Sequence, residues 1–333
     1  MSLQRTSPEK QRGVALIMVL VILALVTLIA TQLVNMRSLY GYRTQNIIAA
    51  ENAWGYAIGA EALAKLALVQ ALKNEDLVHL GQPWAGNEVI FPIDGGRLKA
   101  SLRDGKGCFN INMLADVGAA DDSVRQQKPT SAEQAFIRLL TLIEWEQADN
   151  VAPEAMAASL KDWLDTDSVP TRFDGREDDE YTGYAQPYRT ANQMVIGVSE
   201  LRSVSGFPAE ITDQLLNYIC AIPGNKELTI NVNTIPAEQP ELLASFYKNM
   251  TLATASEVLD GRPGDGFTAE DYNPLVPADV TLIEGMTLSY DSQYFIAYID
   301  VELGNSLTRI KSHLFYQGGS SRVQMLARMG HND

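Results

Sequence analysis

Eight carboxylates gather in the short stretch DWLDTDSVPTRFDGREDDE, where only Arg172 and Arg176 oppose them. They are Asp162, Asp165, Asp167, Asp174, Glu177, Asp178, Asp179 and Glu180. Carboxylates at this density repel one another unless water, cations or a metal ion neutralise them, and oxygen ligands at alternating positions favour Ca²⁺ in an exported protein. An EF-hand is excluded because Val169 and Pro170 occupy a ligand place and the glycine place of that pattern. On the residues alone, a solvated acidic loop and a calcium site both stay open.

Other catalytic chemistry has little support in the sequence. The three histidines, His79, His313 and His331, are too few and too scattered for a zinc site, and no G-x-S-x-G nucleophile elbow occurs. We therefore expect no enzymatic activity. The net charge is −15, and since the first 13 residues carry +2, the remainder carries −17. This balance argues against nucleic acid as a partner, because phosphate contacts require lysine or arginine.

The elements that must position the acidic stretch begin with an N-terminal anchor. Residues 13–36 form an uncharged apolar run of 24 residues, which at about 1.5 Å per residue can cross a hydrocarbon core of about 30 Å. Arg5, Lys10 and Arg12 precede this run, so we expect a cytoplasmic N-terminus and a body exported beyond Arg37. An A-x-A-like signal-peptidase site is poor after the run, which predicts that the anchor is retained.

The anchor helix is predicted to continue out of the membrane to about Leu72. An apolar stripe recurs at helical spacing, and we expect it to pack on the globular body. The stripe consists of Trp54, Ile58, Ala62, Leu66 and Val69, and it ends at Lys73.

Two hairpins are predicted, one on either side of a helical region. The first turns at Asp94–Gly96, with Leu98, Ala100 and Leu102 on one face, and the second turns at Gly304–Asn305. Between them, a capping box at Ser131 and Gln134 and prolines at 153 and 208 indicate helix starts.

These patterns predict an α+β fold with a long N-terminal helix packed on an antiparallel sheet and a large inserted α-helical domain. The expected order is a leader (1–13), a transmembrane assembly helix (14–36), the first part of the sheet domain (37–104), the inserted helical domain (105–222), the second part of the sheet domain (223–318) and a tail (319–333).

Cys108 and Cys220 are the only cysteines, and they fall at the two seams of the predicted insertion. Export would place them in an oxidising compartment, where they can pair. The bridge would close a loop spanning 112 residues, worth up to about 4 to 5 kcal/mol in the chain-entropy account. Two buried thiols are the alternative if the body is not exported.

The ordered motifs of the chain resemble a known family. They are RGVALIMVLVILAL, GCFNINML, LKDWLDTDSVP, GREDDEY, PYRTANQ, VSELRSVSGF, INVNT and RPGDGF. The first is similar to the start of type IV pilin-like proteins, and the set resembles the K-type minor pseudopilins of type II secretion, the general secretion pathway protein K family. The resemblance implies a pilin-like fold and a protein of the inner membrane, with a periplasmic body that joins the pseudopilus.

The resemblance also implies how the N-terminus is processed. Prepilin peptidase would cut after Gly13, leaving Val14 as the methylated mature terminus ahead of a retained helix. Most pilin-like subunits carry a glutamate at the fifth mature position, which pairs with a neighbour's terminal amine, whereas this chain has Met18. The K-type family shares this absence and is thought to cap the tip.

The resemblance further implies a calcium ion in the helical domain. We expect Asp165, Asp167, Glu177 and Asp178 as its ligands, with Asp179 and Asn192 as substitutes. The partners implied are the I-type and J-type minor pseudopilins, the major pseudopilin, prepilin peptidase and the inner-membrane secretion platform, with secreted substrates as further candidates.

Three functions follow from these observations. The first is a minor pseudopilin that caps the pseudopilus tip and helps initiate its assembly, with the anchor and the stripe at Trp54–Val69 carrying the partner contacts. The second is a calcium-dependent tip adhesin or receptor for exported proteins. The third is an enzyme tethered to the inner membrane, which lacks an evident base or nucleophile.

Overall fold

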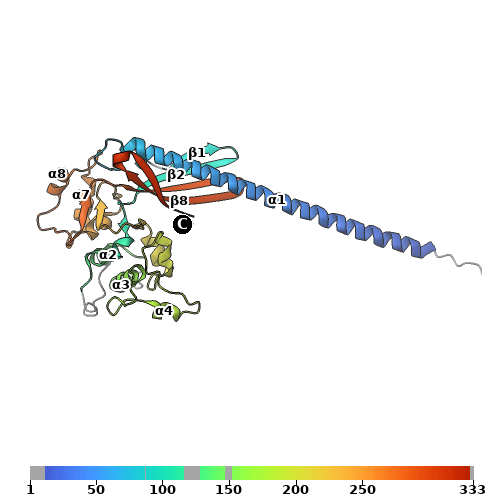
Figure 1. Ribbon diagram of the computed structural model, residues 1–333, viewed down its shortest axis with the longest axis horizontal. Helices are drawn as coiled ribbons and strands as arrows, with labels where there is room; N and C mark the ends of the chain where they lie inside the picture. Colours follow the sequence, from blue (N-terminus) through green and yellow to red (C-terminus); the bar gives the residue numbers. More distant parts are fainter. Residues whose placement is uncertain (1–11, 87, 116–127, 147–151, 331–333) are drawn as a thin grey trace, which may run out of the picture.

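The computed structural model describes residues 12–86, 88–115, 128–146 and 152–330. A single helix, α1 (Arg12–Leu72), extends far beyond the body as a rod, and its C-terminal half lies along an antiparallel sheet (Figure 1). Short helices form a second body on the other side of that sheet. The expected α+β architecture is confirmed.

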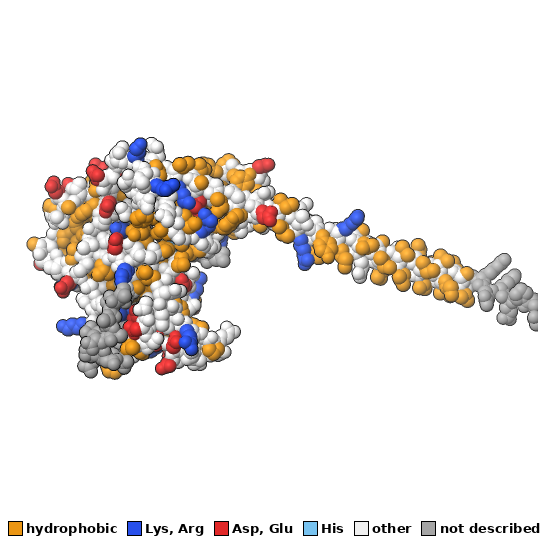
Figure 2. Space-filling view, viewed as in Figure 1, with side chains coloured by type: hydrophobic (Ala, Val, Ile, Leu, Met, Phe, Trp, Pro, Cys, Tyr) orange, Lys and Arg blue, Asp and Glu red, His pale blue; other side chains and the backbone are white. Residues whose placement is uncertain are grey.

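The helix α1 has two halves with different surroundings. Residues from Val14 to Tyr42 have exposed side chains, and the end of the rod far from the body is covered in apolar groups (Figure 2). Among the described residues, this one helix is long and apolar enough to cross a membrane. Its continuation to Leu72 confirms the expected length of the helix.

The face of α1 that packs on the sheet is not the face that we expected. Trp54 and Leu66 of the predicted stripe are 47% and 64% exposed, whereas the buried face consists of small side chains and two leucines. That face comprises Ala53, Ala57, Ala60, Leu68 and Leu72. Alanines allow the helix backbone to approach the sheet closely. Because apolar residues occur on more than one face of α1 and the larger ones lie outside this face, hydrophobicity alone could not identify it.

The main sheet has five antiparallel strands in the order β1-β2-β7-β8-β9. The strands are β1 (Val89–Ile93), β2 (Gly96–Asp104), β7 (Tyr294–Leu303), β8 (Ser306–Gln317) and β9 (Arg322–Gly330). Both predicted hairpins are present, and Gly95 and Gly304 have positive φ values in their turns, which glycine adopts without a steric cost. Residues 319–333, expected to be a tail, contain β9, which pairs with β8.

One face of this sheet carries the apolar contacts with α1. Leu98, Phe295, Ile299 and Leu314 are buried in the core that α1 and the sheet share. The alternating residues of β2 point to the opposite face, as the hairpin pattern predicted.

The helical body contains short elements on both sides of the second seam. Those before residue 222 are β3 (Phe109–Asn110), η2 (Ile111–Leu114), α2 (Ser131–Leu142), α3 (Pro153–Leu164), α4 (Asp178–Thr182), η5 (Val198–Ser203), α5 (Ala209–Leu215) and β4 (Ile219–Cys220). Those after it are β5 (Thr229–Asn231), α6 (Pro240–Ser245), α7 (Leu252–Asp260), α8 (Ala269–Tyr272), η6 (Asn273–Leu275) and β6 (Thr287–Ser289). The remaining short turns of helix are η1 (Pro83–Ala85) and η7 (Gly318–Ser320). The apolar core that starts at Phe109 continues to Met286.

The capping box of α2 lies one residue earlier than predicted. Thr130, not Ser131, is the N-cap: its hydroxyl accepts from Glu133 N at 3.3 Å, and Glu133 Oε2 accepts from Thr130 N at 2.9 Å. Glu133 is fully buried and also binds Arg172 at 2.6 Å, so the cap connects α2 to the acidic segment. Gln134 instead donates to the carbonyl of Pro129.

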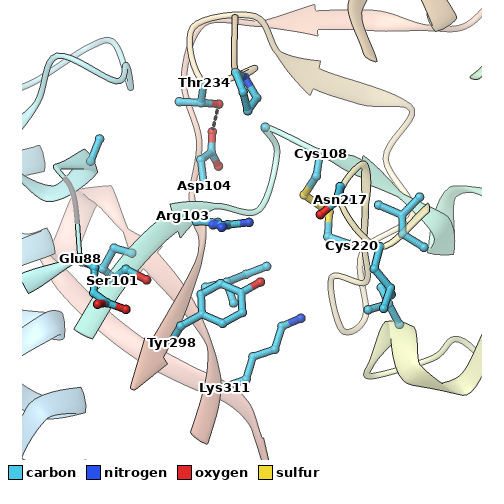
Figure 3. Close-up of a pocket in the computed structure, with 18 of the residues that line it drawn as sticks. Glu88, Ser101, Arg103, Asp104, Cys108, Asn217, Cys220, Thr234, Tyr298 and Lys311 are labelled. Atoms are coloured by element: carbon cyan, nitrogen blue, oxygen red, sulfur yellow. Dashed lines mark hydrogen bonds between the residues drawn. A yellow bond between two sulfur atoms is a disulfide. The ribbon is translucent and has the colours of Figure 1, made fainter. Parts of the chain in front are cut away.

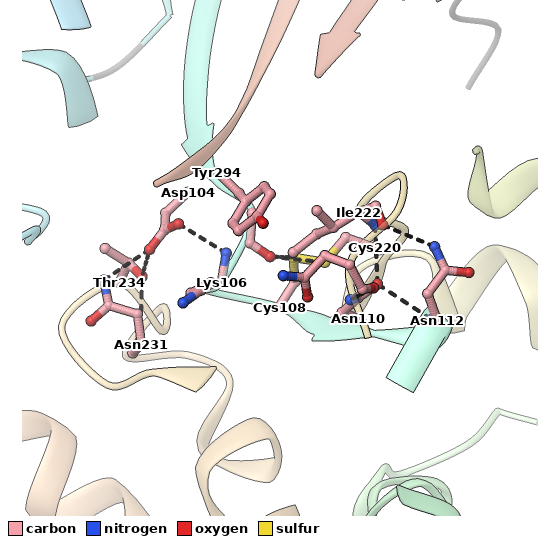
Figure 4. The surroundings of a disulfide bond; sticks show 12 residues. Asp104, Lys106, Cys108, Asn110, Asn112, Cys220, Ile222, Asn231, Thr234 and Tyr294 are labelled. Atoms are coloured by element: carbon pink, nitrogen blue, oxygen red, sulfur yellow. Dashed lines mark hydrogen bonds between the residues drawn. A yellow bond between two sulfur atoms is a disulfide. The ribbon is translucent and has the colours of Figure 1, made fainter. Parts of the chain in front are cut away.

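A disulfide and buried amides hold the seams of the helical body together (Figure 4). Cys108 and Cys220 are bonded, with their Cα atoms 5.8 Å apart, which confirms the expected pair. Asn110 pairs in register with Cys220, and its Oδ1 accepts from Ile222 N at 3.0 Å. At the end of β2, buried Asp104 accepts from Asn231 Nδ2 at 2.8 Å, so the sheet is tied to the segment after the second seam.

A buried ion pair fixes α1 on the sheet. Glu61 is 2% exposed, and its carboxylate accepts from Arg328 Nε on β9 at 2.7 Å and from Ser312 Oγ on β8 at 2.7 Å. Lys65 Nζ lies 2.6 Å from the same carboxylate. Burial alone would raise the pKa of Glu61, but the hydrogen bonds from Arg328, Lys65 and Ser312 outweigh it and lower this pKa to about 2.

Replacing Glu61 with glutamine should lower the free energy of unfolding by about 2 kcal/mol, because Arg328 would lose its charged partner in a buried contact. Since the folded pKa of Glu61 is about 2, below the ordinary value of 4.5, its contribution is complete above pH 4.5 and is lost as the pH falls towards 2. The difference between wild type and Glu61→Gln in urea midpoint should therefore shrink over that range.

Glu302→Gln is the matched control, because Glu302 pairs with Arg97 at 2.6 Å in an exposed position on the same sheet. We expect this change to leave the urea midpoint unaltered. Equal effects of the two substitutions would contradict the anchoring role of Glu61.

Breaking the disulfide should destabilise the helical body. Cys108 and Cys220 are separated by 112 residues, so by restricting the unfolded chain their bond adds up to about 4 to 5 kcal/mol to the free energy of unfolding. We expect the double variant Cys108→Ser/Cys220→Ser and the reduced wild type to unfold at a lower urea concentration than the oxidised protein. An unchanged midpoint on reduction of the wild type would refute a stabilising role for the bond.

Candidate functional site

Three carboxylates of the acidic segment meet between α3 and α4. Asp165 is the C-cap of α3 and Glu177 is the N-cap of α4, so the two helix ends bring them together across the intervening loop. Oxygen atoms of Asp165, Asp167 and Glu177 all lie within 4.8 Å of one another. Residues far apart on an extended chain thus form one cluster of oxygen donors.

This cluster is buried and short of hydrogen-bond donors. Asp165 is 6% exposed and Glu177 is 5% exposed, and Asp165 Oδ1 and Glu177 Oε1 have no hydrogen-bond partner within the described chain. Asp162 Oδ2 and Asn192 Oδ1 are also buried and without a partner. A buried acceptor without a donor costs about 1–3 kcal/mol, so the segment holds several oxygens that require a positive ligand.

The electrostatics of the cluster agree with this requirement. Burial, followed by the neighbouring carboxylates, raises the pKa of Asp165 to about 7 and that of Glu177 to about 8. Burial also raises the pKa of Asp162 to about 6. Without a cation, Glu177 would be mostly protonated and Asp165 partly protonated at neutral pH, and a divalent cation would replace those protons.

The basic residues of the segment bind carboxylates outside the cluster. Arg172 pairs with Glu133 at 2.6 Å, and Arg176 lies 4.0 Å from Glu180. Arg172 has a φ of 56°, a left-handed backbone conformation that residues other than glycine rarely adopt. The arginines therefore hold the shape of the loop and leave the three carboxylates unneutralised.

The four expected ligands divide into three that meet and one that does not. Asp178 Oδ1 accepts from Thr190 N at 3.1 Å and from Thr190 Oγ1 at 2.9 Å, and its Oδ2 lies 3.6 Å from Arg189. It belongs to the start of α4 and not to the group of three. Asp179, the first substitute, is exposed.

Asp162 was not among the ligands that we expected from the sequence, yet it lies beside the three carboxylates. Its Oδ1 accepts from Thr171 N at 2.8 Å, while its other oxygen is orphaned beside the cluster. Its position on α3, three residues before Asp165, was the available signal, because residues three apart share a helix face.

Calcium fits this set of donors. Ca²⁺ binds six to eight oxygen atoms at about 2.3–2.6 Å and accepts carboxylates and amide carbonyls in flexible arrangements. Asp165, Asp167 and Glu177 would supply the charge, and the orphaned oxygens of Asp162 and Asn192 lie in the same segment. The absence of cysteine and histidine from the cluster disfavours zinc.

A second candidate site is an apolar groove between α1 and the sheet edge. Its cavity volume is about 520 Å³, and its walls come from α1 and from β1, the outer strand of the sheet. Gly55 and Gly59 form part of its floor, and no atom lies within 4 Å of a Cβ built on either. Leu63 and Phe91 line it with exposed fractions of 64% and 50%, so apolar surface remains uncovered.

The residues predicted for processing and assembly lie at the N-terminal end of the rod. Val14 and Met18 are 56% and 62% exposed on α1, and Gly13 belongs to its first turn. Residues 1–11 of the predicted leader lie outside the described residues.

Family models match the helical body. The model described as Type II secretion system (T2SS), protein K, first domain, covers residues 107–224, and the protein K model covers residues 230–273. The first match includes both seam cysteines, Cys108 and Cys220, and the carboxylate cluster.

Relatives match nearly the whole chain. Type II secretion system protein K of Aeromonas hydrophila is 35% identical over 97% of this chain and 98% of its own length. The protein of the same name from Pectobacterium carotovorum is 33% identical over 96% of both chains.

A solved structure matches the fold. A chain in the crystal structure of the GspK–GspI–GspJ complex from the type 2 secretion system of enterotoxigenic Escherichia coli is 30% identical, with a TM-score of 0.73. The match covers 87% of this chain and 100% of that one. The sequence motifs, the helix-on-sheet fold and these relatives together show that the chain belongs to the type II secretion system protein K family of minor pseudopilins.

Proposed function

We propose that this minor pseudopilin caps the tip of the pseudopilus and helps initiate its assembly with the I-type and J-type minor pseudopilins. The observation that carries the proposal is the groove beside Gly55 and Gly59, an uncovered apolar surface on a helix that is already anchored. The similar structure is a complex with GspI and GspJ, which supports the choice of partners. The family is one of secretion subunits and not of enzymes.

The rod enters the assembly through the membrane. Prepilin peptidase would remove residues 1–13, and Val14 would become the methylated end of a helix that stays in the inner membrane, with the body in the periplasm. The major pseudopilin and the inner-membrane secretion platform would contact this part. The exposed apolar side chains from Val14 to Val34 support the proposal, because such a surface is stable only in lipid or against other helices.

Two features support a position at the tip of the pseudopilus: a missing carboxylate on the rod and the bulk of the helical body. With Met18 at the fifth mature position, the rod offers no carboxylate to the terminal amine of a subunit above it. The helical body also projects sideways from the sheet, where it would obstruct a subunit stacked on top (Figure 1).

Calcium would stabilise the acidic loop between α3 and α4, which has too few apolar side chains to be stabilised by their burial. Asp165, Asp167 and Glu177 meet at the loop between α3 and α4, and the pKa values of Asp165 and Glu177 are raised, so an ion there would offset the repulsion among the carboxylates. The ion has a structural role in this account and supports no chemical step. Secreted substrates would reach the tip as further contacts of the same body.

Filling the groove should prevent assembly without harming the fold. Gly59→Leu places a side chain where no atom lies within 4 Å, and it also removes the helix cost of glycine, about 1 kcal/mol. We expect the variant to melt at or above the wild-type temperature, yet to lose copurification with the coexpressed I-type and J-type subunits.

Gly319→Leu is the matched control, because its Cβ also meets nothing within 4 Å and it lies in η7, away from the groove. It should copurify as the wild type does. Normal copurification of Gly59→Leu would contradict docking in the groove.

Calcium should raise the thermal stability of the wild type through the three clustered carboxylates. At a hundredfold excess over Kd, binding to the folded state alone adds about 2.7 kcal/mol. We expect Asp165→Asn/Asp167→Asn to lose this calcium-dependent rise in Tm, while its stability in a chelator is equal to or above that of the wild type because a repulsion is removed.

Asp174→Asn provides the control within the same loop, since Asp174 is exposed and outside the cluster. Its calcium response should match the wild type. An unaltered response in the Asp165/Asp167 double variant would exclude this cluster as the site.

A further inference from the structure

A large cleft lies on the face of the sheet that points away from α1. Its cavity volume is about 880 Å³, and it separates the sheet from the helical body (Figure 3). Strands β2, β7 and β8 form one wall, and η5, β4 and the disulfide form the other. The groove beside Gly59 is on the opposite side of the sheet, and the two surfaces meet only at Trp84, Gly86, Ser101 and Leu102, which line both.

Two cations flank one aromatic ring on the sheet wall. The Arg103 guanidinium lies 5.3 Å from the centroid of the Tyr298 ring, and Lys311 Nζ lies 5.2 Å from the same centroid. Tyr298 and Lys311 are direct register partners on β7 and β8, and Arg103 is one step away diagonally on β2. Figure 3 shows both cationic side chains pointing into the cleft.

Lys311 is held in an unusual environment for an ammonium group. The residue is only 7% exposed, and a buried charge is costly unless an anion or hydrogen-bond acceptors compensate it. An aromatic face supplies about 1–2 kcal/mol of this compensation. Within the described part of the chain, no carboxylate forms an ion pair with Lys311 or Arg103.

The other charges around the cleft are already paired. Lys99 lies 3.5 Å from Glu88, and Arg202 lies 2.7 Å from Asp213. Asp300 is 3.4 Å from Arg309 on β8. Asp104, which also lines the cleft, is buried and accepts hydrogen bonds from Asn231, Thr234 and the backbone N–H of Lys106.

Arg103 and Lys311 are therefore an uncompensated positive pair in a chain whose net charge is −15. This local charge is opposite in sign to the chain as a whole. The negative charge of the whole chain does not attract anions from a distance. The positive pair therefore favours an anion only once that anion is inside the cleft.

We propose that this cleft binds an acidic segment of a partner polypeptide, with a glutamate or aspartate carboxylate placed between Arg103 and Lys311. A guanidinium pairs with a carboxylate through two parallel hydrogen bonds, and the buried ammonium gains most from an added anion. The opposite wall suits a peptide, because Val198, Leu216 and Ile219 offer apolar contact. Asn217 and Gln239 add amide groups that can bond to a peptide backbone.

Calorimetric titration of the full chain in detergent micelles tests this inference. The probe is the blocked peptide Gly-Leu-Glu-Glu-Leu-Gly, and the comparison is the same peptide with both glutamates replaced by glutamine. We expect the glutamate peptide to bind, the glutamine peptide to bind at least about tenfold more weakly, and both Arg103→Gln and Lys311→Met to weaken glutamate-peptide binding by about tenfold or more.

Arg97→Gln is the matched control, because Arg97 lies on the same face of β2, undergoes the same charge change and is paired with Glu302. It should bind the peptide as the wild type does. Arg103 is exposed, so Arg103→Gln keeps the test valid if Lys311→Met does not fold.

Failure of the glutamate peptide to bind, or equal binding by Arg103→Gln and the wild type, would overturn the inference. Binding of inorganic phosphate in place of the peptide would overturn the assignment to a polypeptide. Arg103 and Lys311 do not line the groove, and Gly59 does not line the cleft. Copurification with sister pseudopilins can therefore persist when peptide binding is lost, and the two proposals can fail separately.

Discussion

The contact between the alanine face of α1 and the sheet determines what the rest of the molecule can do. Ala53, Ala57 and Ala60 bring the helix close to the strands, and the buried pair of Glu61 and Arg328 fixes its register. An all-apolar contact would tolerate slippage of the helix along the sheet, whereas a buried carboxylate needs its own arginine. Because small residues face inward, the larger apolar side chains remain on the outer surface, where Leu63 and Leu66 are exposed. One contact thus both anchors the rod and leaves a surface for assembly.

The sequence predicted the elements better than it predicted their contacts. The rod length and the hairpins at Gly95 and Gly304 follow from local patterns, since alternation and turn residues specify a strand pair without tertiary information. The packing face of α1 was predicted wrongly, because apolar residues occur on more than one face of the helix and the buried face is built mostly from alanines. The strand β9 was missed although Val323, Met325, Ala327 and Met329 alternate along it, and its pairing with β8 makes it the fifth strand of the sheet.

The carboxylate cluster shows the same division between local and tertiary information. Charge density alone identified the segment, and Asp165, Asp167 and Glu177 do meet. Asp178 was separated from them by Thr190, a residue 12 positions away whose hydroxyl and N–H occupy its oxygen. The inward position of Asp162 depends on how the loop folds back to Thr171. The sequence therefore shows that the carboxylates are present, but the conformation of the loop determines which of them share a site.

The central claim is that the outer face of α1 is the assembly surface, and photocrosslinking in cells tests it most directly. A photoreactive amino acid at Leu63, which is 64% exposed beside the groove, should crosslink to the I-type or J-type pseudopilin. The same photoreactive amino acid in place of Ile196, which is 50% exposed on the helical body, should give no crosslink to these subunits. Crosslinks to these subunits from Ile196 and none from Leu63 would contradict the account.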